Sequence, residues 1–136
     1  MVQLHASTVA LHGCGVIILG PSGSGKSSLA LELMAVGAVL VADDRTDLRV
    51  ADGRLIASAP AEIAGRIEAR GVGILPAEAA PAALTLACDL GAAEDMRLPQ
   101  WRHAEWLGVR VPLVLGPYRP HLYAALRQML LAGRLD

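Results

Sequence analysis

With 136 residues, the chain is long enough for one compact domain and too short for two of ordinary size. Twelve basic against thirteen acidic residues give a net charge of -1, so the sequence predicts no basic surface for a nucleic-acid backbone. Although 54% of the residues are hydrophobic, runs such as Val36 to Ala42 are far shorter than the roughly 20 residues of a membrane span.

The cysteines and the first residues indicate a reducing compartment. Cys14 and Cys88 lie far apart and form no CxxC pair, so neither a zinc site nor a disulfide framework is indicated. The segment from Met1 to Gly25 contains no Lys or Arg, and so lacks the basic start of a signal peptide. We therefore expect a cytoplasmic protein.

The first predicted elements follow one another as strand, strand, helix and strand. Thr8–Leu11 and Val16–Leu19 are short aliphatic runs separated by a tight turn, which is typical of paired strands. From Lys26 to Val36 the apolar residues recur at helical spacing, and Gly37 is a suitable C-terminal stop. Ala38–Ala42 then has the pattern of a buried strand, which completes a βαβ unit.

The rest of the chain adds strands and one helix. Thr46–Ala51 and Arg54–Ser58 flank Asp52-Gly53, a dipeptide favoured in type I′ hairpin turns because both central residues need positive φ. The remaining segments are a loop or irregular helix at Pro76–Ala83, strands at Thr85–Cys88 and Val109–Leu115, and an amphipathic helix at Pro120–Leu131. The sum is an α/β domain with a mixed sheet.

The segment before the first predicted helix matches the phosphate-binding motif GxxxxGK[ST]. Its residues are Gly20, Pro21, Ser22, Gly23, Ser24, Gly25, Lys26 and Ser27. The glycines let backbone N–H groups turn toward phosphate oxygens, Lys26 reaches the outer phosphates, and Ser27 ligates Mg²⁺. This P-loop predicts a polyphosphate ligand. It leaves the reaction open between an NTPase switch, a kinase and a nucleotide-sensing module.

Two aspartates, Asp43 and Asp44, directly follow the strand after the P-loop helix. Phosphoryl transfer needs further carboxylates to hold a metal and to deprotonate the nucleophile. We expect this return strand to be parallel, so that its carboxyl end lies beside the P-loop. Because side chains alternate along an extended chain, only one of the two aspartates needs to face the phosphate.

Other polar residues are less informative by themselves. Glu68 and Arg70 lie in Ile67–Ile74 among apolar and glycine positions, a pattern that favours a surface strand with a solvated Glu/Arg pair. His5 has the pattern of an ordinary polar residue at a strand edge. Spacing does not select an arginine that covers the transferring phosphate; the scattered candidates are Arg97, Arg102, Arg110 and Arg119.

Taken together, these segments resemble the catalytic domain of HPr kinase/phosphorylase, a bifunctional enzyme that phosphorylates a serine of the phosphocarrier protein HPr and removes that phosphate by phosphorolysis. The resemblance runs from His5 to about Pro120. It is carried by His5 and Gly13-x-Gly15, the P-loop, Leu40–Arg45 with its double aspartate, and Ile67–Ile74, which is similar to the family's LEIRGLGI signature. It implies the P-loop fold shared by HPr kinase and phosphoenolpyruvate carboxykinase.

The resemblance also implies a role for each matching residue. Asp43 would accept the proton of the serine hydroxyl in the kinase direction, and Lys26 would stabilise the transferring phosphoryl group. Ser27 and Glu68 would coordinate Mg²⁺. His5 stands at the place of the family's active-site histidine. Arg97, in Met96-Arg97-Leu98, resembles its active-site arginine, with Pro99 in place of a following glycine.

The implied ligands and partners are ATP, Mg²⁺ and HPr or an HPr-like phosphocarrier, in a homo-oligomer that is hexameric in the family. ATP, GTP and pyrophosphate all remain open as the phosphoryl donor, because the P-loop contacts phosphates rather than a base. The chain resembles a short form of the enzyme without the N-terminal domain. We therefore expect residues 1–136 to be a single P-loop kinase catalytic domain.

One departure from the family bears on the reverse reaction. Pro117-Tyr118-Arg119-Pro120 resembles the first half of the family's PVRPGR segment, which serves dephosphorylation, but His121-Leu122 replaces its Gly-Arg. We expect a Mg²⁺-dependent serine kinase with weak or absent phosphorylase activity. A small-molecule P-loop kinase, which would have an arginine-rich lid, and a non-catalytic nucleotide-sensing regulatory module stay open as alternatives.

Overall fold

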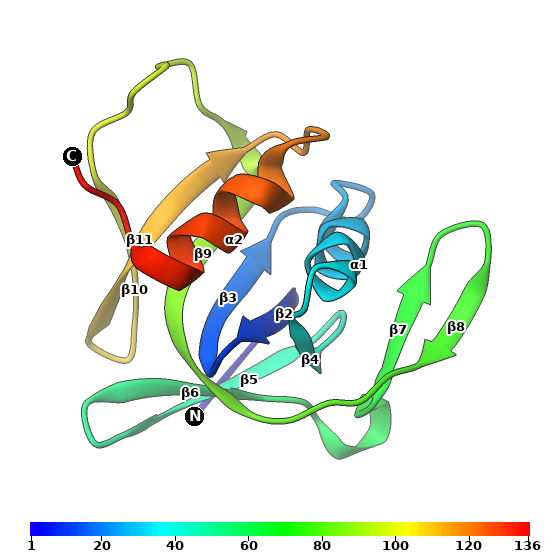
Figure 1. Cartoon of the computed structure of the whole chain (residues 1–136). Coiled ribbons are helices and arrows are strands. Elements are labelled where there is room, and N and C mark those ends of the chain that lie inside the picture. The colour runs from blue at the N-terminus through cyan, green and yellow to red at the C-terminus, as the bar shows by residue number, and fades with distance from the viewer.

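One mixed sheet of nine strands forms the body of the protein, whose computed structural model describes residues 1–136 (Figure 1). Its strands are β1 (Val2–Leu4), β2 (Ala6–Leu11), β3 (Cys14–Leu19), β4 (Val39–Ala42), β5 (Thr46–Ala51), β6 (Arg54–Ser58), β9 (Ala82–Ala93), β10 (Arg102–Trp106) and β11 (Val109–Gly116). The order is β1-β5-β6-β9-β3-β2-β4, and β11 lies between β9 and β10. The mixed α/β fold expected from the sequence is confirmed.

Two helices and one small hairpin complete the chain. Helices α1 (Lys26–Ala35) and α2 (Leu122–Ala132) lie together over the same face of the sheet (Figure 1). A short 3₁₀ helix at Ala61–Ile63 leads into a separate two-stranded sheet of β7 (Arg66–Ala69) and β8 (Gly73–Pro76), which projects from the body beside α1. Neither helix is long and apolar enough to cross a membrane.

The strand after the P-loop helix, β4, has the predicted direction, but it does not pair with the P-loop strand β3. Strand β4 runs the same way as β3, because each is antiparallel to β2. However, β2 lies between them, since its tight turn at His12-Gly13 pairs it directly with β3. The return strand is therefore parallel to the P-loop strand without being hydrogen-bonded to it.

The hydrophobic core is divided between the two faces of the sheet by strand alternation. Val16 and Ile18 of β3 face α1 and α2, whereas Ile17 between them faces the opposite side. The helices bury Leu29 and Leu126 against the first of these faces. Both helices are thereby fixed to the strand that carries the P-loop.

Local signals located several elements well. Asp52 and Gly53 have φ of 52° and 74°, as a type I′ turn requires, and the predicted hairpin has the expected bounds. The strand at Thr85–Cys88 is the middle of the 12-residue β9. Pro76–Ala83 holds a loop between β8 and β9, so the alternative of an irregular helix is wrong. Sequence pattern missed β1 and β10.

Candidate active site

The P-loop connects the end of β3 to the start of α1 and depends on glycine at its bends. Gly20, Gly23 and Gly25 have φ of 144°, 83° and 104°, which other residues rarely adopt. A Cβ on Gly20 would lie 2.5 Å from the Ser24 hydroxyl oxygen. Because these turns bring the backbone to the first turn of α1, its free N–H groups are available to an anion.

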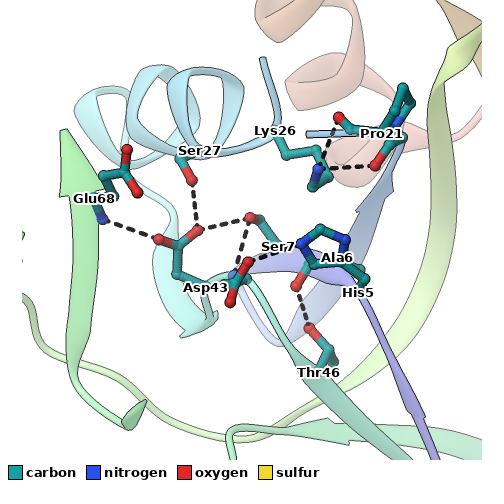
Figure 2. A network of polar contacts seen from close by, with 11 residues as sticks. His5, Ala6, Ser7, Pro21, Lys26, Ser27, Asp43, Thr46 and Glu68 are labelled. Carbon is teal, nitrogen blue, oxygen red and sulfur yellow. Dashed lines mark hydrogen bonds and ion pairs between the residues drawn. The ribbon is translucent and has the colours of Figure 1, made fainter. Parts of the chain in front are cut away.

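Lys26, the only lysine of the chain, is held inside this loop. Its side chain is largely buried, and Nζ donates to the carbonyl oxygens of Gly20 at 2.8 Å and Pro21 at 3.1 Å (Figure 2). The ammonium group is thus satisfied by neutral acceptors and has no carboxylate partner. Its positive charge remains available to a phosphate in the adjoining cavity.

The P-loop borders a cavity of about 340 Å³ that has no hydrophobic lining residue. The loop and α1 form one wall, the end of β1 and the start of β2 another, and the β7–β8 hairpin a third. The lining residues are His5, Ser7, Ser22, Gly23, Gly25, Lys26, Ser27, Ser28, Asp44, Glu68 and Arg70. Such a polar cavity at a helix N-terminus suits a phosphate-containing ligand.

Asp43, at the end of β4, joins three elements through its carboxylate (Figure 2). Oδ1 accepts hydrogen bonds from the hydroxyls of Ser7 and Ser27, each at 2.7 Å. Oδ2 accepts one from the backbone N–H of Glu68 at 2.9 Å. These contacts orient a carboxylate that is only 7% exposed, and they place it beside the P-loop serine.

Asp44 takes a different direction because its backbone is left-handed, with φ of 69°. Its Oδ1 lies 2.8 Å from Nε2 of His5, and both side chains are exposed in the cavity wall. The two carboxylates do take different directions, but the extended backbone assumed through both residues is wrong at Asp44. Asp43 contacts Ser27, and Asp44 contacts His5.

A second cavity of about 300 Å³ adjoins the first one. Asp44 and Glu68 line both cavities, and Asp43 lines the second. The remaining lining residues are Ile63, Arg66, Ile67 and Ile74, which make this space partly apolar. Asp43 therefore faces a space large enough for a side chain of an acceptor, on the far side from Lys26.

The oxygen groups near the P-loop suit magnesium. The Ser27 hydroxyl and the Asp43 and Glu68 carboxylates are hard oxygen ligands of the kind that Mg²⁺ prefers. The structure has no cluster of three or more His, Cys, Asp or Glu side chains placed to hold a metal alone. Mg²⁺ in phosphoryl-transfer sites commonly takes one or two protein ligands together with phosphates and water, so this donor set fits it.

The structure brings most of the predicted site residues to one place. His5, the P-loop, Asp43 and Glu68 all lie at the two cavities. Arg97 does not line either cavity; it is exposed in the loop between β9 and β10. Arg102 forms an ion pair with Glu94 at 2.9 Å, and this contact holds the pKa of the Glu94 carboxyl below its usual range.

Besides Ser28, which directly follows the P-loop, sequence reasoning missed two lining residues of the P-loop cavity, Ser7 and Arg70. Each is two positions from a predicted site residue: Ser7 from His5, and Arg70 from Glu68. Residues two apart on a strand share a face, so this spacing was an available signal. Glu68 and Arg70 are both exposed, as expected for a surface strand, and both also line the P-loop cavity.

These features define the class of protein. A P-loop at the carboxyl edge of a mixed sheet, with a buried aspartate at the end of a parallel strand two places away, defines the P-loop class of fold. The profile of the HPr Serine kinase C-terminal domain matches residues 1–80, which is more than half of the chain. The chain therefore belongs to this family, as the sequence resemblance predicted.

Relatives and a solved structure agree with the family. An HPr kinase/phosphorylase of Clostridium tetani is 47% identical over 73 residues, covering 54% of this chain and 24% of that protein. The HPr kinase/phosphorylase of Caldanaerobacter subterraneus subsp. tengcongensis is 33% identical over 133 residues, covering 88% and 44%. The chain thus spans less than half the length of these curated relatives.

The structure of the Hpr(Ser) kinase/phosphatase from Coxiella burnetii superposes with a TM-score of 0.81 at 30% identity. The match covers 96% of this chain and 88% of that one. The similarity therefore includes the strands and α2 beyond residue 80, where the family profile ends.

Proposed function

We propose that this chain is the catalytic core of an ATP- and Mg²⁺-dependent kinase that phosphorylates a serine of HPr or of an HPr-like phosphocarrier. The observation that carries the proposal is the position of Asp43. Its carboxylate contacts the P-loop serine, Ser27, at 2.7 Å and also borders the second cavity. A base in this position stands between a bound phosphate chain and an incoming acceptor.

The chemistry assigned to Asp43 is proton acceptance. The acceptor serine hydroxyl attacks the terminal phosphorus of ATP, a new O–P bond forms, and the bond to the leaving ADP oxygen breaks. Asp43 orients the hydroxyl and takes its proton as the O–P bond forms. In the reverse direction the same carboxyl group gives the proton back.

The charge on the transferring phosphoryl group is spread by cations around the cavity. Mg²⁺, when bound through Ser27 and Glu68, would neutralise phosphate oxygens. Lys26 lies at the P-loop carbonyls and can turn from them to the phosphates. His5, held by Asp44 at 2.8 Å, lines the same space.

Two arginines are candidates for stabilising the transferring phosphoryl group. Resemblance assigns it to Arg97, whereas Arg70 lines the cavity. Comparing Arg97→Ala with Arg70→Ala separates them. The variant that lowers the rate of phosphoryl transfer while it preserves ATP binding identifies the residue that acts on the transition state.

The test of the function uses labelled ATP, Mg²⁺ and a purified HPr-type carrier, with native protein and Asp43→Asn in parallel. We expect acid-stable phosphate on the carrier with the native protein, and at least about a hundredfold less with the variant. Acid stability distinguishes phosphoserine from phosphohistidine. If ATP binds but the carrier stays unlabelled, the carrier kinase assignment is wrong, and a kinase with another substrate or a nucleotide-sensing module takes its place.

We also propose that the phosphorylase direction is weak or absent. The family's PVRPGR segment has Gly-Arg where this chain has His121-Leu122. Leu122 is buried in the main core at the start of α2, so the side chain at this position belongs to the core rather than to a phosphate site. Rapid phosphate-dependent release of pyrophosphate from serine-phosphorylated carrier would contradict this proposal.

The remaining features of the proposal concern the whole chain. We propose that residues 1–136 act as one P-loop kinase catalytic domain in the cytoplasm, where both free cysteines, Cys14 and Cys88, stay reduced. We also propose a homo-oligomer, supported by exposed apolar side chains outside the site.

A further inference from the structure

The P-loop lies in the middle of the sheet edge at which several parallel strands end. β9 is parallel to β3, and β11 is parallel to β9, so all three strands end at the same edge. β4 runs in the same direction two strands away on the other side. With neighbouring strands about 4.8 Å apart, Asp43 after β4 and the loop after β11 lie about 10 Å to either side of β3.

The loop after β11 places Tyr118 against the P-loop. A Cβ on Gly25 would lie 3.1 Å from Cγ and Cδ1 of Tyr118. The ring therefore packs on the N-terminal end of α1, where the P-loop joins the helix. The Glu32 carboxylate raises the pKa of Tyr118.

The packing on Gly25 leaves part of Tyr118 exposed. Tyr118 remains 37% exposed, although it packs on Gly25. Gly25 also lines the P-loop cavity, so Tyr118 packs on a residue of that cavity's wall. The other three aromatic side chains lie elsewhere: Trp101 before β10, Trp106 in β10, and Tyr123 against the core.

The position of Asp43 determines the direction in which a nucleotide can lie. The transferred phosphate has to be at the Asp43 and Ser27 end of the cavity, since the acceptor base is there. The rest of a nucleoside triphosphate must therefore extend from the P-loop away from Asp43. That direction leads along the edge toward the ends of β9 and β11, and to Tyr118.

We propose that the exposed ring of Tyr118 is the platform on which the nucleobase of the phosphoryl donor stacks, so that this chain takes a nucleoside triphosphate rather than an inorganic polyphosphate. The inference rests on the proposed function for the orientation of the phosphate chain. The family's PVRPGR segment has valine at this place, so the ring is a feature of this chain. Aromatic rings bind every base through its π-face, and this contact tolerates different bases.

The test measures the dissociation constants of Mg-ATP and of inorganic tripolyphosphate by calorimetry, for native protein, Tyr118→Ala and Tyr118→Phe. Tripolyphosphate reports on the P-loop alone, and ATP reports on the P-loop and the base site. We expect Tyr118→Ala to weaken ATP binding about tenfold and to leave tripolyphosphate binding unchanged. Tyr118→Phe should keep the affinity for ATP, since it keeps the ring.

Trp101→Ala is the matched control, because Trp101 is an exposed aromatic residue outside the P-loop cavity. The proposal is overturned if Tyr118→Ala binds ATP as native protein does. It is also overturned if the affinities for ATP and tripolyphosphate fall by the same factor, which would make the ring a structural support of the P-loop. The proposed kinase function fails separately, in the carrier phosphorylation assay, because the binding measurement needs no acceptor.

Discussion

Buried hydroxyl groups near Asp43 distinguish this site from a bare carboxylate beside a P-loop. The Ser7 side chain is inaccessible to solvent and donates to Asp43 Oδ1 at 2.7 Å. Ser27 donates to the same oxygen, but it is also the residue expected to ligate Mg²⁺. If Ser27 turns to the metal, Ser7 is the hydroxyl that continues to hold the carboxylate.

Ser7→Ala should therefore lower kcat for phosphoryl transfer by about tenfold and leave the KM for ATP unchanged. A hydrogen bond to a charged group contributes about 1.5–3 kcal/mol, and each 1.4 kcal/mol changes a rate about tenfold. Steady-state kinetics with the carrier measure both constants. The control is Thr8→Ser, which keeps the hydroxyl that contacts Thr46. A rise in KM without a change in kcat would show that Ser7 acts on nucleotide binding instead.

Cys88 should be protected from alkylation in the folded protein. Its thiol is buried in the core, and burial raises its pKa from 9.0 to about 12. At pH 8 it is therefore protonated and inaccessible, whereas the unfolded chain exposes a thiol of ordinary pKa. In a Cys14→Ser variant, we expect no reaction with iodoacetamide before denaturation and one adduct per chain after it. Rapid labelling of the native variant would contradict this.

The raised pKa of Cys88 also makes the free energy of unfolding decrease at high pH. The unfolded chain releases the Cys88 proton near pH 9, and the folded chain holds it to about pH 12. The contribution of this group is thus fully present below pH 9, and it is lost as the pH rises through that interval.

The β7–β8 hairpin depends on few contacts, although it carries Glu68 and borders Arg70. It forms a sheet of its own, and every residue of β8 is exposed. Ile67 is its one side chain in the main core, where it is almost completely buried. The backbone N–H of Glu68 also holds the hairpin to the body, because it donates a hydrogen bond to Asp43 Oδ2.

Ile67→Ala should reduce the free energy of unfolding by about 2–5 kcal/mol, because it leaves a cavity under the hairpin. It should also lower transferase activity under conditions where the chain stays folded, since Glu68 and the second cavity lose their support. Ile67→Val is the matched variant, with an expected loss of about 1 kcal/mol and near-native activity. Urea unfolding and carrier phosphorylation test the two effects. Full activity of a folded Ile67→Ala protein would show that the hairpin does not position the site.

Elements specified by neighbouring residues were predictable, and those specified by distant ones were not. The Asp52-Gly53 hairpin, the P-loop and helix α1 follow from local chemistry. The aspartate pair was predicted from its place after a buried strand, and the resemblance selected Asp43 and Glu68 as site residues. The insertion of β2 between β3 and β4 and the full length of β9 come from pairing between distant strands. The left-handed backbone of Asp44 and the packing of Tyr118 on Gly25 also depend on contacts between distant residues, so the sequence did not predict them.

At the scale of the whole molecule, the two cores leave several large apolar side chains exposed. Large exposed apolar side chains lie in the loop between β9 and β10, among them Met96, Leu98 and Trp101. The C-terminal segment adjoins this loop, because Arg134 lies over the Trp101 ring at 4.8 Å and contacts the Pro99 carbonyl. Exposed Leu131 and Leu135 belong to that segment.

This surface, formed by the β9–β10 loop and the C-terminal segment, should be an interface between copies of the chain. Monomeric proteins rarely expose a large apolar patch, and its burial would drive association. Sedimentation equilibrium at micromolar concentration should give a multiple of the 14.2 kDa chain mass, and Leu98→Asp should shift it toward the monomer. Val72→Asp, at an exposed position in the hairpin turn, should leave the mass unchanged. A 14.2 kDa species for the native protein would contradict the oligomer. An unchanged mass for Leu98→Asp would place the interface elsewhere.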